Sequence, residues 1–493
     1  RVLPPGKGDD ARARFAVNGL AVYVMRPASE RERVVFSRAL LESLGGARDA
    51  NVAAFFLSQL QIAGGKESVR PLEKYLLDEA LAGPASAALL SIGGPEAMGT
   101  LLKALEKAPR GARLTLVQAL GTARSREAVK KILPLVDSGD EGIRQAALFA
   151  LANIGDPAAG PVLSRSRVAA SYRERSEVPS LYLLYARRLV ESGRSAEGLE
   201  AARAVLEHYQ RPDESQHASA ALSLVVSALG PRALPDVLAA AASPDRRFRG
   251  AALALAESIP GTEATRAWVG KAAAAPPDVR ADILAMLGQR RDGAALAFAR
   301  DSLRSKEMAV RLAAIPAAVR LGGEAVLPDL LPLLASAEAD ECGVLKVALL
   351  GYPGKLVAPE AARLLESTPP PAKAVLIEVL GEKGAREEIE RVFRLAEDPD
   401  PAIREASLVA LGHLAGAADL PRLVPMLEKA SESDDVVRLR EAIASAVLRN
   451  PEPGAHTLVG LLGSASPAGK AAILKALPRI GGGTGSEGLA LEV

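Results

Sequence analysis

Aromatic residues are scarce in this sequence. Phe, Trp and Tyr make up 3% of the 493 residues, although hydrophobic residues as a whole make up 49%. Large aromatic rings usually dominate the energetics of a core. Here Ala, Leu, Val and Ile must fill the core instead, and side chains of this size suit thin layers of helices.

Cysteine is nearly absent as well. The single residue, Cys342, excludes an intramolecular disulfide framework, a CxxC zinc pair and a CxxCH haem attachment within this chain. No histidine lies near it in the sequence, so we predict a small core residue rather than a nucleophile. Cysteine usage therefore leaves the cellular compartment open.

The sequence also lacks an excess of charge of one sign and a long hydrophobic run. Lys and Arg total 61 against 59 Asp and Glu, a formal net charge of +2, so nothing points to nucleic acid or an anionic membrane. The apolar run that ends at Leu229 is cut off by Gly230 and Pro231, well short of the roughly 18 residues that span a bilayer. We predict no membrane span. Because the net charge is close to zero, any partner would have to be bound through local features of the surface.

What the sequence does contain is an internal repeat. The motif acid-x-x-apolar-Arg, followed by a helical apolar pattern, occurs five times, with successive arginines 105, 62, 93 and 34 residues apart. These gaps are close to three, two, three and one units of a single period, which indicates a repeat architecture. The acids and arginines of the motif are Asp140 and Arg144, Asp245 and Arg249, Glu307 and Arg311, Asp400 and Arg404, and Asp434 and Arg438.

The clearest unit begins at Asp140. Apolar residues from Ile143 to Leu151 recur at helical spacing, Gly155 can end the helix, and Pro157 suits the first turn of the next one. The pattern predicts a helix, a tight turn and a second helix. Neither helix can bury its apolar stripe alone, so neighbouring pairs must stack on a shared core.

The D-x-x-[VIF]-R helix, the A-L-x-x-[IL]-G turn and the proline-bearing second helix resemble bacterial HEAT repeats of the phycobilin-lyase-like kind, over most of the chain. The resemblance implies an all-α fold, an α-solenoid of about 13 stacked helix pairs. It also implies a scaffold, in bacteria often joined to envelope-associated domains. We therefore favour a periplasmic or envelope location, with a cytoplasmic one left open.

The expected organisation has three parts. Residues 1–163 form an N-terminal HEAT array, residues 164–227 an insertion, and residues 228–493 a C-terminal HEAT array with an incomplete last repeat. The insertion resembles a tetratricopeptide helix pair that turns at Gly193. Because the sequence starts at Arg1 and stops inside a repeat, we expect processing or a fragment. We also expect the apolar face around Ile473, Leu474 and Leu477 to be covered by another domain, subunit or partner.

The insertion is locally rich in tyrosine and arginine, the residue types enriched at binding hot spots. Four of the seven tyrosines lie in it, and seven arginines stand against three glutamates between Arg165 and Arg194. Two interpretations remain open: the tyrosines fill the core of a longer hairpin, or they form a surface for a partner. The candidate partner-binding residues are Tyr172, Arg173, Arg175, Tyr182 and Tyr185.

The arginines of the repeat motif form a ladder that could suggest phosphate binding. Each one has an acid four residues earlier on the same helix face, so an intrahelical ion pair is the first expectation. We predict a structural role for all ten residues of the five motifs, in which they hold successive turns and repeats in register.

Catalytic and cofactor motifs are missing. The chain has no GxxxxGK[ST] or GxSxG sequence, and its glycine-rich stretch from Gly481 to Ser486 lacks the lysine and the preceding strand that a nucleotide-binding loop needs. Some HEAT-type enzymes bind a di-iron centre through His-Glu dipeptides, but none of the four histidines here is followed by Glu. His208 and His217 flank Asp213 and Glu214, but a metal site made of these residues lacks a further ligand. We predict no catalytic residue, cofactor or metal. The histidines are His208, His217, His413 and His456.

The predicted function is a non-catalytic protein-binding scaffold or subunit of a larger complex. It would bind one or more proteins along a concave surface lined by the second helix of each pair. An alternative is a bilin-lyase or chaperone-like carrier that holds a pigment or client in the groove. Nucleic-acid binding is disfavoured because aromatics are few and charge is balanced.

Overall fold

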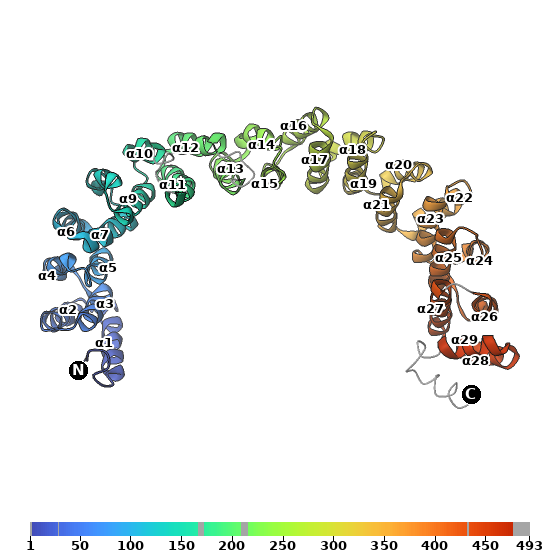
Figure 1. The fold of residues 1–493 in the computed structure, drawn as a ribbon, viewed down its shortest axis with the longest axis horizontal. Coiled ribbons are helices and arrows are strands. Elements are labelled where there is room, and N and C mark those ends of the chain that lie inside the picture. The colour runs from blue at the N-terminus through green and yellow to red at the C-terminus, as the bar shows by residue number, and fades with distance from the viewer. Residues whose placement is uncertain (1, 28, 166–171, 209–214, 431–432, 477–493) are drawn as a thin grey trace. The chain divides into compact units, whose positions relative to one another are not determined.

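The computed structural model (Figure 1) describes residues 2–27, 29–165, 172–208, 215–430 and 433–476. Within these residues every regular element is an α-helix or a short 3-10 helix. The numbering runs to α29, which corresponds to fourteen pairs and one further helix in this part of the chain. The predicted all-α solenoid is therefore confirmed.

The chain divides into two compact units, residues 1–255 and 256–493. In the first unit the odd-numbered helices form one layer, in which each packs on the next as far as α13. They are α1 (Ala11–Tyr23), α3 (Ala50–Ala63), α5 (Ala82–Ile92), α7 (Arg110–Thr122), α9 (Glu141–Ile154), α11 (Tyr172–Glu191), α13 (Ser215–Leu229) and α15 (Arg246–Ala256), which ends at the boundary. The even-numbered helices form the second layer: α2 (Glu30–Gly45), α4 (Lys66–Leu72), α6 (Gly94–Lys107), α8 (Val129–Ile132), α10 (Gly160–Arg165), α12 (Ser195–His208) and α14 (Leu234–Ala240).

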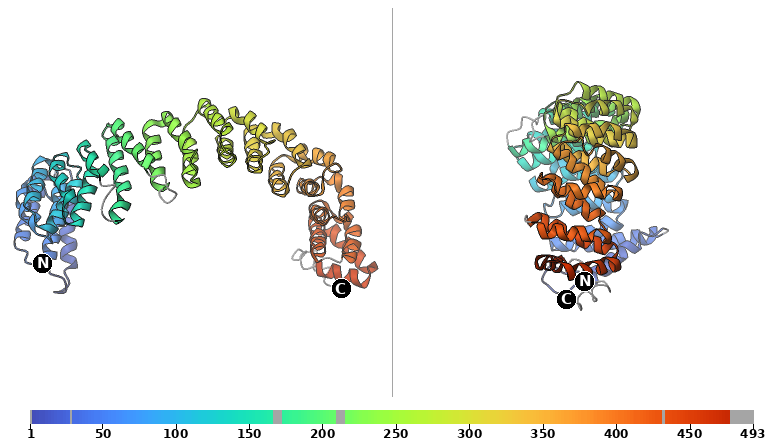
Figure 2. Two further views of the ribbon diagram at one scale, coloured as in Figure 1. Left: turned by 45° about the horizontal axis from the view of Figure 1, so that its top comes forward. Right: turned by 90° about the vertical axis from the view of Figure 1, so that its right-hand side faces the viewer.

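The second unit repeats this arrangement, and Figure 2 shows neighbouring helices of a layer side by side. Its odd layer is continuous and consists of α17 (Pro277–Arg290), α19 (Met308–Gly322), α21 (Ala339–Leu350), α23 (Pro370–Glu382), α25 (Pro401–Leu414), α27 (Ser433–Arg449) and α29 (Pro467–Ala476). Its even layer consists of α16 (Thr262–Ala273), α18 (Leu296–Ser302), α20 (Leu327–Leu330), α22 (Gly354–Leu364), α24 (Ile389–Leu395), α26 (Leu420–Lys429) and α28 (Pro451–Ser464).

The motif helices all belong to the odd layer. Within each unit, Figure 1 shows this layer on the inner side of the bend. The sequence analysis assigned the inner surface to the second helix of each pair, and that expectation is wrong. The first helix, which carries the acid and the arginine, lines it instead.

The α9 unit shows how the sequence builds one pair. The Asp140 carboxylate accepts a hydrogen bond from the Ile143 N–H at 3.1 Å and so caps the helix. Ile143 and Leu151 are buried, and Gly155 ends the helix with φ +68°, a left-handed conformation that favours glycine. Asp156 then caps the next turn. Each of these steps follows from local sequence.

Glycine and alanine let neighbouring odd helices approach closely at three places. A Cβ added to Gly121, Gly288 or Gly381 would lie between 2.6 and 2.9 Å from an alanine of the next odd helix. The scarcity of aromatic residues fits this geometry, because large rings would hold the layers apart. The facing residues are Ala150, Ala317 and Ala410.

One apolar cluster runs through the second unit from Leu284 to Ile473, and Cys342 is buried in it, as predicted. Ile473 is fully buried because α29 packs on α26 and α27. The expectation that Ile473 lies on an open end face is therefore wrong. Leu474 is 38% exposed, and Leu477 lies outside the described residues.

One stretch, Ser215–Ala240, has the length and apolar composition of a candidate membrane span. The structure divides this stretch into α13 and α14. The break falls at Gly230, whose φ of +56° turns the chain directly before Pro231. Length and composition alone are weak support for a span, because the core helix of a stacked array meets the same test.

Four arginines of the ladder share one backbone contact. Each donates a hydrogen bond from Nη1 to the carbonyl oxygen six residues earlier, in the turn before its own helix. Arg249 is almost fully buried, with 1% of its surface exposed. Arg144, Arg249, Arg311 and Arg404 bond in this way to Ser138 (2.7 Å), Ser243 (2.8 Å), Ser305 (3.0 Å) and Asp398 (3.2 Å).

The ladder also connects neighbouring pairs. Arg311 Nη2 lies 3.0 Å from Glu341 Oε2, and Arg404 Nε lies 2.8 Å from Asp435 Oδ2. Both acids belong to the next odd helix. Among the described residues, Arg311 forms its ion pairs with Glu341 and Glu338, not with Glu307 four residues earlier as the sequence suggested.

The acids of the motif have a different part in the structure. Asp140, Asp245 and Asp400 each accept a backbone N–H in the first turn of their helix, whereas the Glu307 side chain makes no capping bond to α19. At the fifth motif, Arg438 pairs backward with Glu405 at 3.1 Å, and Asp434 lies exposed in the first turn of α27.

The close helix contact at Gly381 can be tested by adding one methyl group. In the Gly381→Ala variant the new Cβ lies 2.8 Å from the Ala410 Cα, and we expect a loss of about 1–3 kcal/mol in the free energy of unfolding. The matched control is Gly412→Ala in α25, whose Cβ meets Ala442 only at 3.8 Å; it should gain up to about 1 kcal/mol. Urea denaturation followed by circular dichroism measures both, and equal stability of the two variants would contradict the close contact.

The Arg311–Glu341 pair predicts a pH-dependent contribution to stability. The hydrogen bond from Arg311 lowers the pKa of Glu341, so the contribution is present above the unfolded pKa of about 4.3 and is lost as the pH falls through the lower folded value. We expect Glu341→Gln to lose about 1–3 kcal/mol at neutral pH, a difference that shrinks in acid.

The control for this pair is Glu360→Gln, which breaks the more exposed ion pair of Glu360 with Arg363. It should change stability by less than about 0.5 kcal/mol. Thermal unfolding of both variants at pH 3 to 7 makes the comparison. A Glu341→Gln deficit that stays constant over this range would show that the carboxylate charge contributes nothing.

Candidate functional site

Two of the five candidate partner-binding residues lie in the core. Tyr182 and Tyr185 are 9% and 4% exposed, and their ring centroids are 5.9 Å apart. Burial raises the pKa of Tyr185 to about 12, and its hydroxyl donates to the Pro157 carbonyl oxygen at 3.5 Å. For these two rings the structure favours packing over partner contact. The side chains of Tyr172, Arg173 and Arg175 lie outside the described part of the structure.

Arginine in the insertion serves internal contacts as well. Arg188 donates from Nε to Asn153 at 3.0 Å and from Nη1 to Glu191 at 2.6 Å. The Asn153 amide donates in turn to the Gly121 carbonyl oxygen at 3.0 Å. These bonds connect α11 to α9 and α9 to α7. Gly193 turns the chain between α11 and α12 with φ +83°, while the tetratricopeptide resemblance and the three-part division stay predictions.

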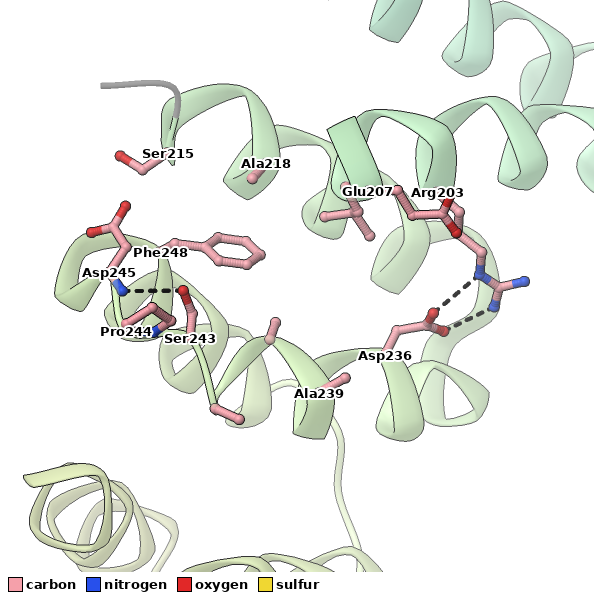
Figure 3. Close-up of a pocket in the computed structure, with 13 residues that line it drawn as sticks. Arg203, Glu207, Ser215, Ala218, Asp236, Ala239, Ser243, Pro244, Asp245 and Phe248 are labelled. Atoms are coloured by element: carbon pink, nitrogen blue, oxygen red, sulfur yellow. Dashed lines mark hydrogen bonds and ion pairs between the residues drawn. The ribbon is translucent and has the colours of Figure 1, made fainter. Parts of the chain in front are cut away.

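A groove with a largely apolar lining lies in the first unit, between residues 203–218 and residues 236–248. It has a volume of about 430 Å³ and is formed by the C-terminal ends of α12 and α14 and the N-terminal ends of α13 and α15 (Figure 3). We call it the α12–α14 groove. Its apolar lining consists of Leu206, Ala218, Ala239, Ala240, Ala242, Pro244 and Phe248.

The local sequence explains why space remains here. Helix α14 has 7 residues against 14 in α12, a length that is usual in the even layer. Four consecutive alanines, residues 239–242, follow where larger side chains could have filled the gap. The result is a shallow apolar floor.

Charged residues border this floor at both ends. At one end Arg203 forms a bidentate ion pair with Asp236, at 3.0 and 2.9 Å (Figure 3), and Asp236 raises the pKa of Arg203. At the other end Asp245 Oδ1 accepts the Arg247 N–H at 2.9 Å, while the buried Oδ2 has no hydrogen-bond partner among the residues that the structure describes. Glu207 is exposed and lies on the Arg203 side of the groove (Figure 3).

The sequence analysis named only Asp245 from this groove, and only as part of the ladder. The run of four alanines was a weak signal, because residues 272–275 are also four alanines. The depth of the groove depends on how α12 and α14 lie against each other, which one sequence does not show.

The remaining surface features are weaker candidates for a binding site than the α12–α14 groove. Depressions beside Tyr75 and beside Arg449 are more open to solvent. Among the described residues no group of three or more His, Cys, Asp or Glu side chains could hold a metal ion. The candidate ligands Asp213 and Glu214 lie outside the described residues. Large hydrophobic residues are exposed on α1 and α2, including Phe15 and Val35.

Solved structures with a similar fold include karyopherin Kap121p bound to the SUMO protease Ulp1p, with 12% identity and a TM-score of 0.46, and Kap121p bound to RanGTP, with 13% and 0.46. They cover 97% and 95% of this chain, which spans only 57% of theirs. Human deoxyhypusine hydroxylase in complex with glycerol matches at 19% identity and a TM-score of 0.23, covering 52% of this chain and 96% of its own.

Among curated protein sequences, no relative matches the chain. The family model for HEAT repeats matches residues 98–181, 265–343 and 358–448. These segments together cover more than half of the sequence and lie in both units. The chain therefore belongs to the HEAT-repeat family.

Proposed function

We propose that this chain is a non-catalytic scaffold that binds other proteins, and that the α12–α14 groove receives a segment of a partner. The observation that carries the proposal is an open apolar floor bordered by charge, where the ends of α12, α13, α14 and α15 meet. Stacked helix pairs offer extended surfaces for such contacts.

The groove suits a peptide segment better than an enclosed ligand. Small-molecule sites usually bury most of the ligand surface, whereas this groove is open along one side. Its free charges are acidic, since Arg203 is neutralised by Asp236, so it disfavours the phosphates of nucleic acid. An apolar side chain on the alanine floor with polar contacts at the ends matches the usual anatomy of a protein interface.

The proposal is tested by filling the groove. We expect Ala239→Trp to reduce recovery of a stoichiometric partner about tenfold, which corresponds to about 1.4 kcal/mol of binding free energy. The matched control is Ala196→Trp, which adds the same ring at an exposed position near the start of α12. Tagged full-length variants are isolated from cells that naturally express the protein, and co-purifying proteins are quantified by mass spectrometry.

Thermal unfolding checks that both variants keep their fold. Equal recovery of the partner with both variants would remove the groove from the proposal. An absorption spectrum of the same samples tests the alternative of a pigment carrier. A coloured ligand recovered with no stoichiometric protein would contradict the scaffold function itself.

A further inference from the structure

Two capping aspartates of the first unit are equivalent by position but differ in their partners. Asp140 caps α9 through Oδ1, and its Oδ2 accepts a hydrogen bond from Arg110, the first residue of α7 and 30 residues earlier. Asp245 caps α15 through Oδ1 in the same way. The residue 30 positions before it is Ser215, the first residue of α13.

Serine at this position leaves the second oxygen of Asp245 without the cation that Asp140 has. Asp245 Oδ2 is buried, and within the described part of the chain it has no hydrogen-bond partner. A buried acceptor that stays unsatisfied destabilises the structure, and more so when it is charged. A cation placed at the groove end would remove this destabilisation.

The unpaired charges around the groove are negative, so they would also attract a cation. Among the described residues neither Glu207 nor Asp245 forms an ion pair, while Arg203 is held by both oxygens of Asp236. The groove therefore has two free carboxylates and no free cation in the described structure. Both carboxylates lie beside the apolar floor.

We propose that the partner segment carries a Lys or Arg next to an apolar side chain. The cation takes the place at Asp245 that Arg110 takes at Asp140, and the apolar side chain lies on the floor around Ala239. This inference rests on the proposed function and adds to it the chemistry of the segment that is bound.

The chemistry is tested by selecting random 12-residue peptides displayed on phage against the full-length protein, with removal of phage that also bind Ala239→Trp. We expect the remaining peptides to be enriched in Lys or Arg within a few positions of an aliphatic or aromatic residue. The most enriched sequence is then synthesised, labelled with fluorescein and titrated by fluorescence anisotropy.

Three variants separate the charge from the fold. Asp245→Asn keeps a good helix cap but removes the charge, and should weaken the peptide about tenfold. Ser215→Arg supplies the cation from within the chain and should weaken it at least as much. The control Asp140→Asn changes the equivalent cap outside the groove and should stay within about twofold of wild type.

Groove-dependent peptides without basic residues, or equal binding to Asp245→Asn and wild type, would overturn the assigned chemistry and leave the groove as a protein-binding site. No groove-dependent enrichment would overturn this inference as a whole. The co-purification measurement with Ala239→Trp then decides separately whether the scaffold function stands.

Discussion

The fold depends on one constraint: no helix pair in this chain can bury its apolar stripe by itself. Ala, Leu and Val supply most of the buried surface, and one continuous cluster from Leu284 to Ile473 runs through most of the second unit. Glycine and alanine at the contacts let the helix backbones approach closely. Each pair is therefore stable only between neighbours, and stability is a sum of local interfaces.

Apolar contact is not directional, so it does not determine by itself how far one pair is shifted against the next. Charge-assisted hydrogen bonds have defined geometry, and the ladder provides them at regular intervals. Arg311 and Arg404 each bond to a carbonyl oxygen of their own turn and to an acid of the next odd helix. One side chain thus connects the turn, the helix and the following pair.

Much of the fold could be predicted because its determinants are local. The Asp140 cap, the buried face of α9 and the turn at Gly155 all follow from residues close in sequence. The partners of the ladder arginines could not be predicted in this way, because Glu341 and Asp435 become neighbours only when successive pairs stack. Burial of Tyr182 and Tyr185 likewise depends on packing between helices.

The groove was missed for a related reason. Periodicity shows where repeats agree, but here the informative feature is a local combination: four alanines at the end of α14, and Ser215 at the position where α7 has Arg110. Each departure alone is tolerable in a stack whose neighbouring pairs remain intact. Sequences that break a local rule without compensation tend to do so at functional sites.

The alanines and Ser215 lie together in space at this groove. The alanines form a shallow apolar floor, and Ser215 does not supply Asp245 with the cation that Arg110 supplies to Asp140. A partner segment with an apolar and a basic side chain would supply an apolar contact and a cation at once. Binding at this groove would then use the same two interactions, apolar burial and a carboxylate–cation pair, that hold the helix pairs of the array to one another.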